Sequence, residues 1–228
     1  MNSSPSFELK ILYDNKCNET GFLTGFGFSA AIYNFFSNKY LLFDTGGNGN
    51  ILIHNIKKFN LNISQIENII ISHNHSDHAG GLNAIYHLNP KTTIYVPVKN
   101  TSSFKRAFPE ANIVGILEVK ELDENIFSSG QINSSYIPEQ ALFLKANENK
   151  IILLVGCAHP GLERFILKSQ QLGEIKAIFG GFHGFNKFSY LKNIEVIGAC
   201  HCTRHITSIS ELYPSQFRKI CVGDSFVF

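Results

Sequence analysis

The chain has 228 residues, of which 44% are hydrophobic, so it is long enough to bury a sizeable core. Its formal net charge is +2, and Lys and Arg are scattered along the sequence, which argues against a nucleic-acid-binding surface and favours a small-molecule substrate. No Pro-, Gly- or Ser-rich linker interrupts it, and the sequence predicts one domain over residues 1–228.

The N-terminal residues and the cysteines bear on the cellular location of the protein. Residues 1–10 lack the basic start and the apolar stretch of a secretion signal, and no apolar run approaches the ~18 residues of a membrane span. Five cysteines without framework spacing are typical of reduced thiols. We therefore expect a cytoplasmic protein with no membrane contact, whose oligomeric state the sequence does not predict.

Apolar runs and their periodicity predict the elements of the first half. Strands are expected at residues 7–13, 26–33, 39–43, 69–71 and 92–96, and near Ile113 and Leu117. Helices are expected at residues 51–59 and 82–88 and near Phe104. Residues 14–25 form a polar loop, and the patternless residues 128–138 are the strongest candidate for a mobile loop over a site.

The second half repeats this plan. Strands are expected at residues 141–145, 151–155, 175–179 and 194–199, and helices at residues 162–172 and before Pro214. Three of these strands run into loops that carry His159, His183 and His201. A site assembled from strand ends would have this pattern.

The most informative stretch is residues 67–82. Its three consecutive isoleucines predict a strand buried on both faces, and four side chains that bind metals follow the strand closely: His73, His75, Asp77 and His78. In an extended segment two imidazoles that are two residues apart point the same way and can share one cation. A catalytic zinc site uses about three protein ligands, so these four groups can begin two sites.

Three stretches resemble the signature of the metallo-β-lactamase superfamily: His73-Asn-His75-Ser-Asp77-His78, the Gly80-Gly81 pair after it, and Phe43-Asp44-Thr45-Gly46 before it. The resemblance implies an α/β fold, the four-layer αβ/βα sandwich of two mixed sheets flanked by helices. It also implies a site for one or two metals at the edge of the sheets, used mostly for hydrolysis. Asp44 follows a predicted strand and either orients a ligand imidazole or opens an ordinary turn.

Within this resemblance the metal ligands fall into two sets. We assign one metal to His73, His75 and His159, and the other to Asp77, His78 and His201. Many members of the superfamily carry Gly-Asp where this chain has Gly156-Cys157, so Cys157 is either a thiolate ligand in place of that aspartate or a buried, inert cysteine. A separate structural zinc site is a further alternative, built from Cys200, Cys202 and Cys221.

Residues 156–159, 180–183 and 200–203 are similar to one branch, the archaeal dihydropterin ribofuranosylaminobenzene 5'-phosphate synthase group and its bacterial relatives. That group usually has glycine where this chain has Arg204. The Arg204 cation either pairs with a substrate phosphate at a helix start or narrows the pocket. His183 either contacts substrate as a proton donor or is a satisfied core histidine.

These observations predict a metal-dependent hydrolase that acts on a small phosphorylated substrate through a metal-activated water, which Asp77 helps to orient. Two zinc ions are expected, and iron or manganese would suit the same ligands. Three alternatives remain: a transferase similar to the synthase group, an iron-binding redox module, and a metal-binding module without turnover. The chain has no flavin- or nucleotide-binding fingerprint, which disfavours the redox module.

Overall fold

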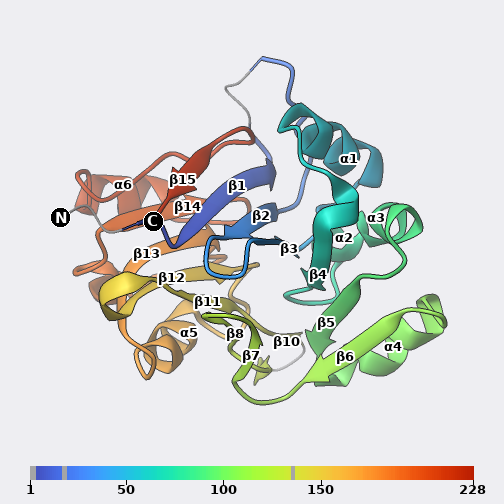
Figure 1. Ribbon diagram of the computed structural model, residues 1–228. Helices are drawn as coiled ribbons and strands as arrows, with labels where there is room; N and C mark the ends of the chain where they lie inside the picture. The colour runs from blue at the N-terminus through green and yellow to red at the C-terminus, as the bar shows by residue number, and fades with distance from the viewer. Residues whose placement is uncertain (1–3, 17–19, 135–136) are drawn as a thin grey trace.

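The computed structural model describes residues 4–16, 20–134 and 137–228. Parts of both predicted loops, residues 17–19 and 135–136, lie outside the described residues, and so does Cys17. Two mixed sheets stack face to face and helices cover their outer faces, with α1, α3 and α4 on one side and α5 and α6 on the other (Figure 1). This is the four-layer fold that the superfamily resemblance predicts.

The first sheet contains most strands of the first half and takes its last strand from the C-terminal end. Its order is β15-β1-β2-β3-β4-β5-β6. The strands are β1 (Phe7–Tyr13), β2 (Ser29–Asn34), β3 (Lys39–Phe43), β4 (Ile66–Ile70), β5 (Thr93–Pro97), β6 (Asn112–Ile116) and β15 (Ser225–Val227). From β3 to β6 neighbouring strands are parallel, so their carboxyl ends meet at one edge of the sheet.

The second sheet has the order β14-β13-β12-β11-β8-β7. Its strands are β7 (Lys120–Asp123), β8 (Ile126–Ser128), β11 (Leu142–Lys145), β12 (Lys150–Val155), β13 (Glu174–Gly181) and β14 (Val196–Cys200). The strands β12, β13 and β14 are parallel, so three carboxyl ends again meet at one edge. A small ribbon of β9 (Ile132–Asn133) and β10 (Pro138–Glu139) stands apart from both sheets.

The helices pack on the sheets through apolar faces. They are α1 (Gly49–Lys58), α2 (Ser76–Ala79), α3 (Leu82–Leu88), α4 (Thr101–Ala107), α5 (Leu162–Ser169) and α6 (Ile206–Leu212), with 3-10 turns at Ile63–Gln65, Val98–Asn100, Asn147–Asn149 and Phe188–Leu191. The side chain of Asn48 caps α1 by accepting from the N–H groups of Asn50 and Ile51. Within the described residues, no helix is long and apolar enough to span a membrane.

Phenylalanines fill much of the space between the sheets. Phe7, Phe28, Phe43 and Phe179 are fully buried there, and the Phe28 and Phe43 rings meet edge to face with centroids 6.4 Å apart. Edge-to-face contacts are the arrangement that aromatic quadrupoles favour. The phenylalanine content of the chain therefore builds the central core, as the sequence predicted.

Four sequence predictions were wrong or imperfect at particular residues. The strand expected at residues 26–33 begins only at Ser29, because Gly27 has a φ of 146° and the Phe26 side chain turns out to solvent. No strand forms at Leu117, which is exposed between β6 and β7. The helix expected at residues 162–172 ends at Ser169. The expected loop at residues 128–138 instead contains β9 and the start of β10 and buries Ser129 and Gln131.

Candidate metal centre

All seven predicted ligands come together where the carboxyl ends of the strands meet. They form two groups in which the donor atoms lie within 4.8 Å of one another: His73, His75 and His159 in the first, and Asp77, His78, Cys157 and His201 in the second. The His73 and His78 rings are 4.3 Å apart between centroids, so the two groups are neighbours. Within the described part of the chain, Cys200, Cys202 and Cys221 do not form a third group.

The first group consists of three imidazoles, two of which are clearly held in their neutral form. His73 is fully buried, and its Nε2 lies 3.1 Å from Nδ1 of His75. Burial lowers the pKa of His73 well below its usual value, and burial together with nearby imidazoles lowers the pKa of His159 to about 4. Neutral imidazole is the form that binds metals. At neutral pH His73 and His159 therefore have lone pairs ready for a cation.

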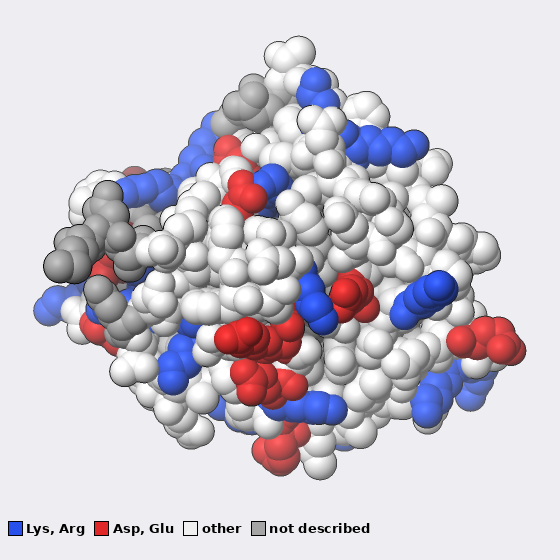
Figure 2. Space-filling model, in the orientation of Figure 1, with Lys and Arg blue, Asp and Glu red and all other residues white. Residues whose placement is uncertain are grey.

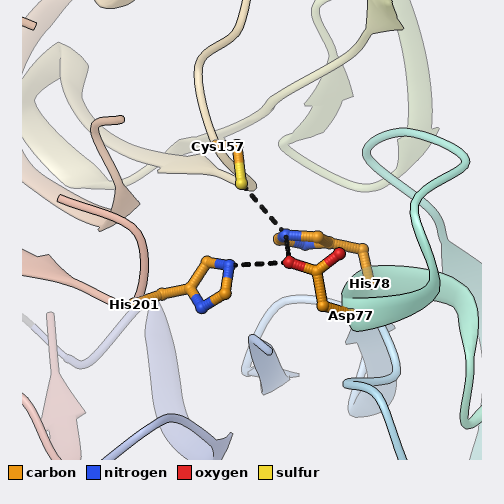
Figure 3. Close-up of side chains that lie close together, drawn as sticks. All are labelled: Asp77, His78, Cys157 and His201. Carbon is orange, nitrogen blue, oxygen red and sulfur yellow. Dashed lines mark hydrogen bonds and ion pairs between the residues drawn. The ribbon is translucent and has the colours of Figure 1, made fainter. Parts of the chain in front are cut away.

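The second group combines a carboxylate, two imidazoles and a thiol, which converge from three segments (Figure 3). Asp77 Oδ2 lies 3.1 Å from His201 Nε2 and 3.5 Å from His78 Nε2. Burial alone would raise the pKa of Asp77, but the hydrogen bond with His201 and the charge of His78 bring it down to about 2. Asp77 is therefore an anion at neutral pH.

Cys157 is both buried and aimed at the second group. Its Sγ lies 3.1 Å from His78 Nε2 and 3.2 Å from Cys202 Sγ. The contact with Cys202 and burial raise the pKa of the Cys157 thiol. Burial by itself therefore does not separate a ligand from an inert cysteine here, whereas the approach to His78 Nε2 fits a ligand.

Asp44 fixes ring orientations in both groups, which is the orienting function that its position predicted. Its Oδ2 lies 2.7 Å from His78 Nδ1, and it accepts hydrogen bonds from the Ser72 N–H at 2.6 Å and the Ser72 hydroxyl at 2.7 Å. Since that hydroxyl donates to Asp44, it accepts from His73 Nδ1, 2.9 Å away. Both imidazoles therefore direct Nδ1 at these oxygens and turn Nε2 towards the other predicted ligands, which is where a cation would bind.

His201 is oriented by residues from the opposite end of the sequence. Asn15 Oδ1 lies 3.1 Å from His201 Nδ1, and Asn15 Nδ2 donates to the His201 carbonyl at 3.0 Å. The ring of Phe26 lies 4.9 Å from that of His201 between centroids. The sequence analysis missed Asn15 and Phe26, which no local pattern marks, and it named Cys202 only in the motif at residues 200–203 and in a separate zinc site, whereas its Sγ lies 3.2 Å from that of Cys157.

Several strand ends adopt a backbone conformation that is uncommon for residues other than glycine. Asp44, Ala158, His183 and His201 have φ values of 57°, 57°, 43° and 49°. A left-handed residue turns the chain sharply and costs on the order of 1–3 kcal/mol, so the surrounding structure must hold it in place. The site is therefore built on tight turns that direct side chains inward.

His183 and Arg204 lie beside the first group, next to a cavity. The cavity has a volume of about 280 Å³ and is lined by His159, His183, Leu162, Phe185 and Lys187 among others. Burial and the charge of Arg204 lower the pKa of His183, whose ring centroid is 5.0 Å from that of His159. Arg204 is exposed and precedes α6, and its N–H donates to the His183 carbonyl at 2.8 Å.

A second hollow of about 210 Å³ is lined in part by a residue of the first group, His75. Its other lining residues are Asn74, Asn100, Ile137 and Pro138.

The residues present fit a metal centre. His159 Nε2 is buried without a hydrogen-bond partner, which is costly unless something else satisfies it. Imidazole, carboxylate and thiolate are the donors that zinc and related ions prefer. A pair of cations shared by the two groups would complete these donors.

The family comparison agrees with this geometry. Residues 25–133 match the family model described as the metallo-beta-lactamase superfamily. The chain has the fold of this superfamily, and the residues that match the family model make up just under half of its length. The match includes His73, His75, Asp77 and His78, whereas the other predicted ligands lie beyond it.

Two curated proteins similar to this chain come from Methanocaldococcus jannaschii. One, described as uncharacterized, is 28% identical over 250 residues and covers 90% of this chain and 94% of the relative. The other is named 7,8-dihydropterin-6-methyl-4-(beta-D-ribofuranosyl)-aminobenzene-5'-phosphate synthase. It is 27% identical over 253 residues and covers 83% of this chain and 85% of the relative.

Solved structures share the fold at low sequence identity. The metallo-beta-lactamase fold protein YhfI from Bacillus subtilis has a TM-score of 0.71 at 10% identity, covering 99% of this chain and 100% of that one. A diphosphatase of the PhnP family has a TM-score of 0.66 at 13% identity, covering 97% of both chains. These similarities establish the superfamily fold and leave the substrate open.

Proposed function

We propose that this protein is a metal-dependent hydrolase that acts on a small phosphorylated molecule. The observation that carries the proposal is the convergence of seven metal-binding side chains in two adjacent groups, with one edge opening into a cavity. Zinc ions are the proposed cofactors, with iron or manganese as alternatives for the same donors. When bound, such ions act as Lewis acids and lower the pKa of water towards about 7.

The chain's own residues would divide the remaining work. Asp77, an anion at neutral pH, would accept a hydrogen bond from the attacking water and orient it. His183 lines the cavity and could donate a proton to the leaving group, and its lowered pKa makes it a stronger acid when protonated. The apolar side chains of Leu162 and Phe185 would help to exclude water from the cavity.

The positive side chain of Arg204 near the cavity favours an anionic substrate. Arg204 is close enough to His183 to lower its pKa, whereas Lys187, which lines the cavity, is paired with Glu163 of the same lining at 2.6 Å. On the face shown in Figure 2, Lys and Arg are dispersed among uncharged and acidic residues and form no continuous basic band. That face therefore offers no continuous positive track for a long nucleic acid.

A phosphate contact at Arg204 has a direct test. A charge-assisted contact contributes about 1.5–3 kcal/mol, so Arg204→Ala should raise KM for a phosphorylated substrate about tenfold or more and leave bound metal unchanged. Arg106→Ala, on the distant helix α4, is the matched control. An equal loss on the phosphorylated substrate and on its dephosphorylated analogue, or no loss on either, would count against the contact.

The hydrolase itself is tested by metal analysis followed by a substrate screen. Protein purified without added metal, and after reconstitution, should hold about two transition-metal ions per chain. The metal-loaded protein should hydrolyse at least one member of a set of phosphoesters, lactones and thioesters. At most one ion after reconstitution would contradict the two-metal assignment, and a loaded protein inactive on the whole set would contradict the hydrolase.

A transferase is the second candidate, because one curated relative is named as a phosphate synthase. The two activities differ in the acceptor, which is water for a hydrolase and a second substrate for a transferase. Incorporation of labelled oxygen from water into the product would favour the hydrolase. A product that forms only in the presence of a second organic substrate would favour the transferase.

A further inference from the structure

Glu139 is a buried carboxylate that the metal centre does not use as a ligand. Its side chain is fully buried at the end of β10. Its oxygens accept hydrogen bonds from backbone N–H groups, and no Lys or Arg is among these donors. A buried carboxylate is costly unless its oxygens are satisfied, so this arrangement calls for an explanation.

Three successive N–H groups converge on this carboxylate. Oε1 accepts from Cys157 at 2.9 Å and from Ala158 at 2.9 Å, and Oε2 accepts from His159 at 2.7 Å. Ala158 has a left-handed φ of 57°, which turns the three N–H groups towards one point. Such a concave run of N–H groups binds anions, and here the chain's own carboxylate fills it.

The segment held in this way carries one ligand of each metal group. Cys157 belongs to the second group and His159 to the first, so the conformation around Ala158 sets the spacing between the two centres. A turn with a left-handed alanine is costly on its own and needs external contacts to persist. The Glu139 carboxylate provides three of them.

The next residue holds the other ligand-bearing loop. The Gln140 N–H donates to the Ser72 carbonyl at 2.9 Å, and its side-chain amide donates to the Ile71 carbonyl at 2.9 Å and the Tyr95 carbonyl at 3.1 Å. Ser72 directly precedes His73. Two adjacent residues therefore link the loop after β4 to the loop after β12.

We propose that Glu139 is a positioning residue for both metal centres, acting through the backbone of Cys157, Ala158 and His159. The inference rests on the proposed function in one respect, namely that Cys157 and His159 are ligands. It goes beyond that function by assigning both centres to one carboxylate, so that disturbing this carboxylate weakens both sites together.

The test compares metal binding in Glu139→Gln and in the wild type. The amide that this substitution introduces can accept through one atom only, so at least one of the three N–H groups then faces a donor. Asn34→Ala is the matched control, because Asn34 is also fully buried, makes three hydrogen bonds and lies at the far end of β2. Both variants should lose stability, but only Glu139→Gln should lose metal affinity.

Titration of the metal-free proteins with Co²⁺ gives the decisive readout. The ultraviolet thiolate-to-cobalt band reports Cys157, and the visible bands report both centres. We expect Glu139→Gln to weaken both binding steps about tenfold or more and to shift the thiolate band, with Asn34→Ala like the wild type. Circular dichroism identifies any variant that fails to fold, and Glu139→Asp, which keeps the charge, then replaces it.

Each outcome bears on one claim. Wild-type affinities and an unchanged thiolate band in a folded Glu139 variant would overturn the positioning inference and leave the hydrolase proposal intact. Equal losses in Asn34→Ala would also overturn it, because the effect would then be general destabilisation. A wild-type protein that binds no Co²⁺ would instead overturn the proposed function.

Discussion

Asp44 shows how much of the site depends on a residue that binds no metal. It contacts His78 directly and His73 through the Ser72 hydroxyl. Carboxylates that receive the second ring nitrogen of a ligand histidine fix its tautomer and raise its basicity. The Asp44 side chain therefore orients one imidazole in each predicted ligand group. Its loss should weaken metal binding most at His78, which it contacts directly.

Asp44→Asn should weaken metal binding at the second group by about tenfold to a hundredfold, because the amide cannot accept all three hydrogen bonds and carries no charge. The first group should weaken less, since Ser72 still accepts from His73. Calorimetric titration of the metal-free protein measures both steps. Asp123→Asn, at a carboxylate that accepts from Asn34 and Ser37, is the control. Unchanged affinity at the second step would refute this account of Asp44.

Acidification should remove metal from the second group before the first. Protons compete with metals for ligands, so a ligand with a raised pKa is lost at higher pH. Burial opposes protonation of His78, but Asp44 outweighs it and raises the pKa, and the pKa of Cys157 is raised as well. His73 and His159 have lowered pKa values, the latter about 4.

Asp77, with a pKa of about 2, protonates only in much stronger acid and does not reverse the order. Metal retained on the protein after dialysis at stepwise lower pH would reveal the order. The thiolate-to-cobalt band should disappear while about one ion per chain remains. If both ions leave in a single step, or if the thiolate band outlasts the other absorption, the prediction fails.

At the scale of elements, close backbone packing leaves no room for a side chain at the carboxyl end of β13. Gly180 has a φ of 122°, and a Cβ there would lie 1.9 Å from the Val155 carbonyl oxygen. The backbone of β12 is therefore pressed against β13 where Gly156 and Cys157 begin. A side chain of any size would push these two strands apart at the site.

Gly180→Ala should lower the free energy of unfolding by about 2 kcal/mol or more, since it adds both a clash with backbone and a left-handed alanine. Gly184→Ala is the matched control, because a Cβ there meets nothing within 4 Å. That change should stay within about 0.5 kcal/mol of the wild type. Denaturant unfolding measures both, and equal stabilities of the two variants would contradict the strand-contact argument.

The elements that the sequence predicted correctly are those with a strong local pattern. The strands β1, β3 and β12 and the helix α3 follow uninterrupted apolar patterns, and the four clustered ligands lie within one short stretch. By contrast, β9 and β10 have two residues each, too few for any periodicity. The aromatic residues beside Gly27 have the composition of a strand. The backbone conformation of Gly27, with its positive φ, instead turns the chain there and leaves Phe26 exposed.

Within the site, too, some residues could be predicted from local sequence patterns and others could not. His159 and His201 could be predicted because each follows a strand of the repeated plan. The contacts of Asn15 with His201 and of Cys202 with Cys157 join residues far apart in sequence, 186 and 45 positions respectively. Such contacts depend on how loops from different strands pack, so they cannot be predicted from residue spacing in the sequence.

At the scale of the whole molecule, each ligand group draws on both sheets. In the first group His73 and His75 follow β4 of one sheet, while His159 follows β12 of the other. Ions bound here would stabilise the folded state by about 4 kcal/mol at a concentration a thousand times Kd. Thermal unfolding with and without a chelator should show this difference, and equal midpoints would contradict it.

Such ions would also act as reversible cross-links between the sheets, with consequences for how the molecule opens. Without them, hydrogen exchange should quicken at amides near the site, such as the Ile71 N–H that bonds to Tyr95 and the Gly181 N–H that bonds to Gly156. The Asn38 N–H, at the opposite end of the first sheet, should keep its protection. Uniform acceleration at both ends would argue against local opening. The metal-free protein should therefore open first along the edge where the carboxyl ends of the strands meet, while the opposite ends of the sheets stay packed.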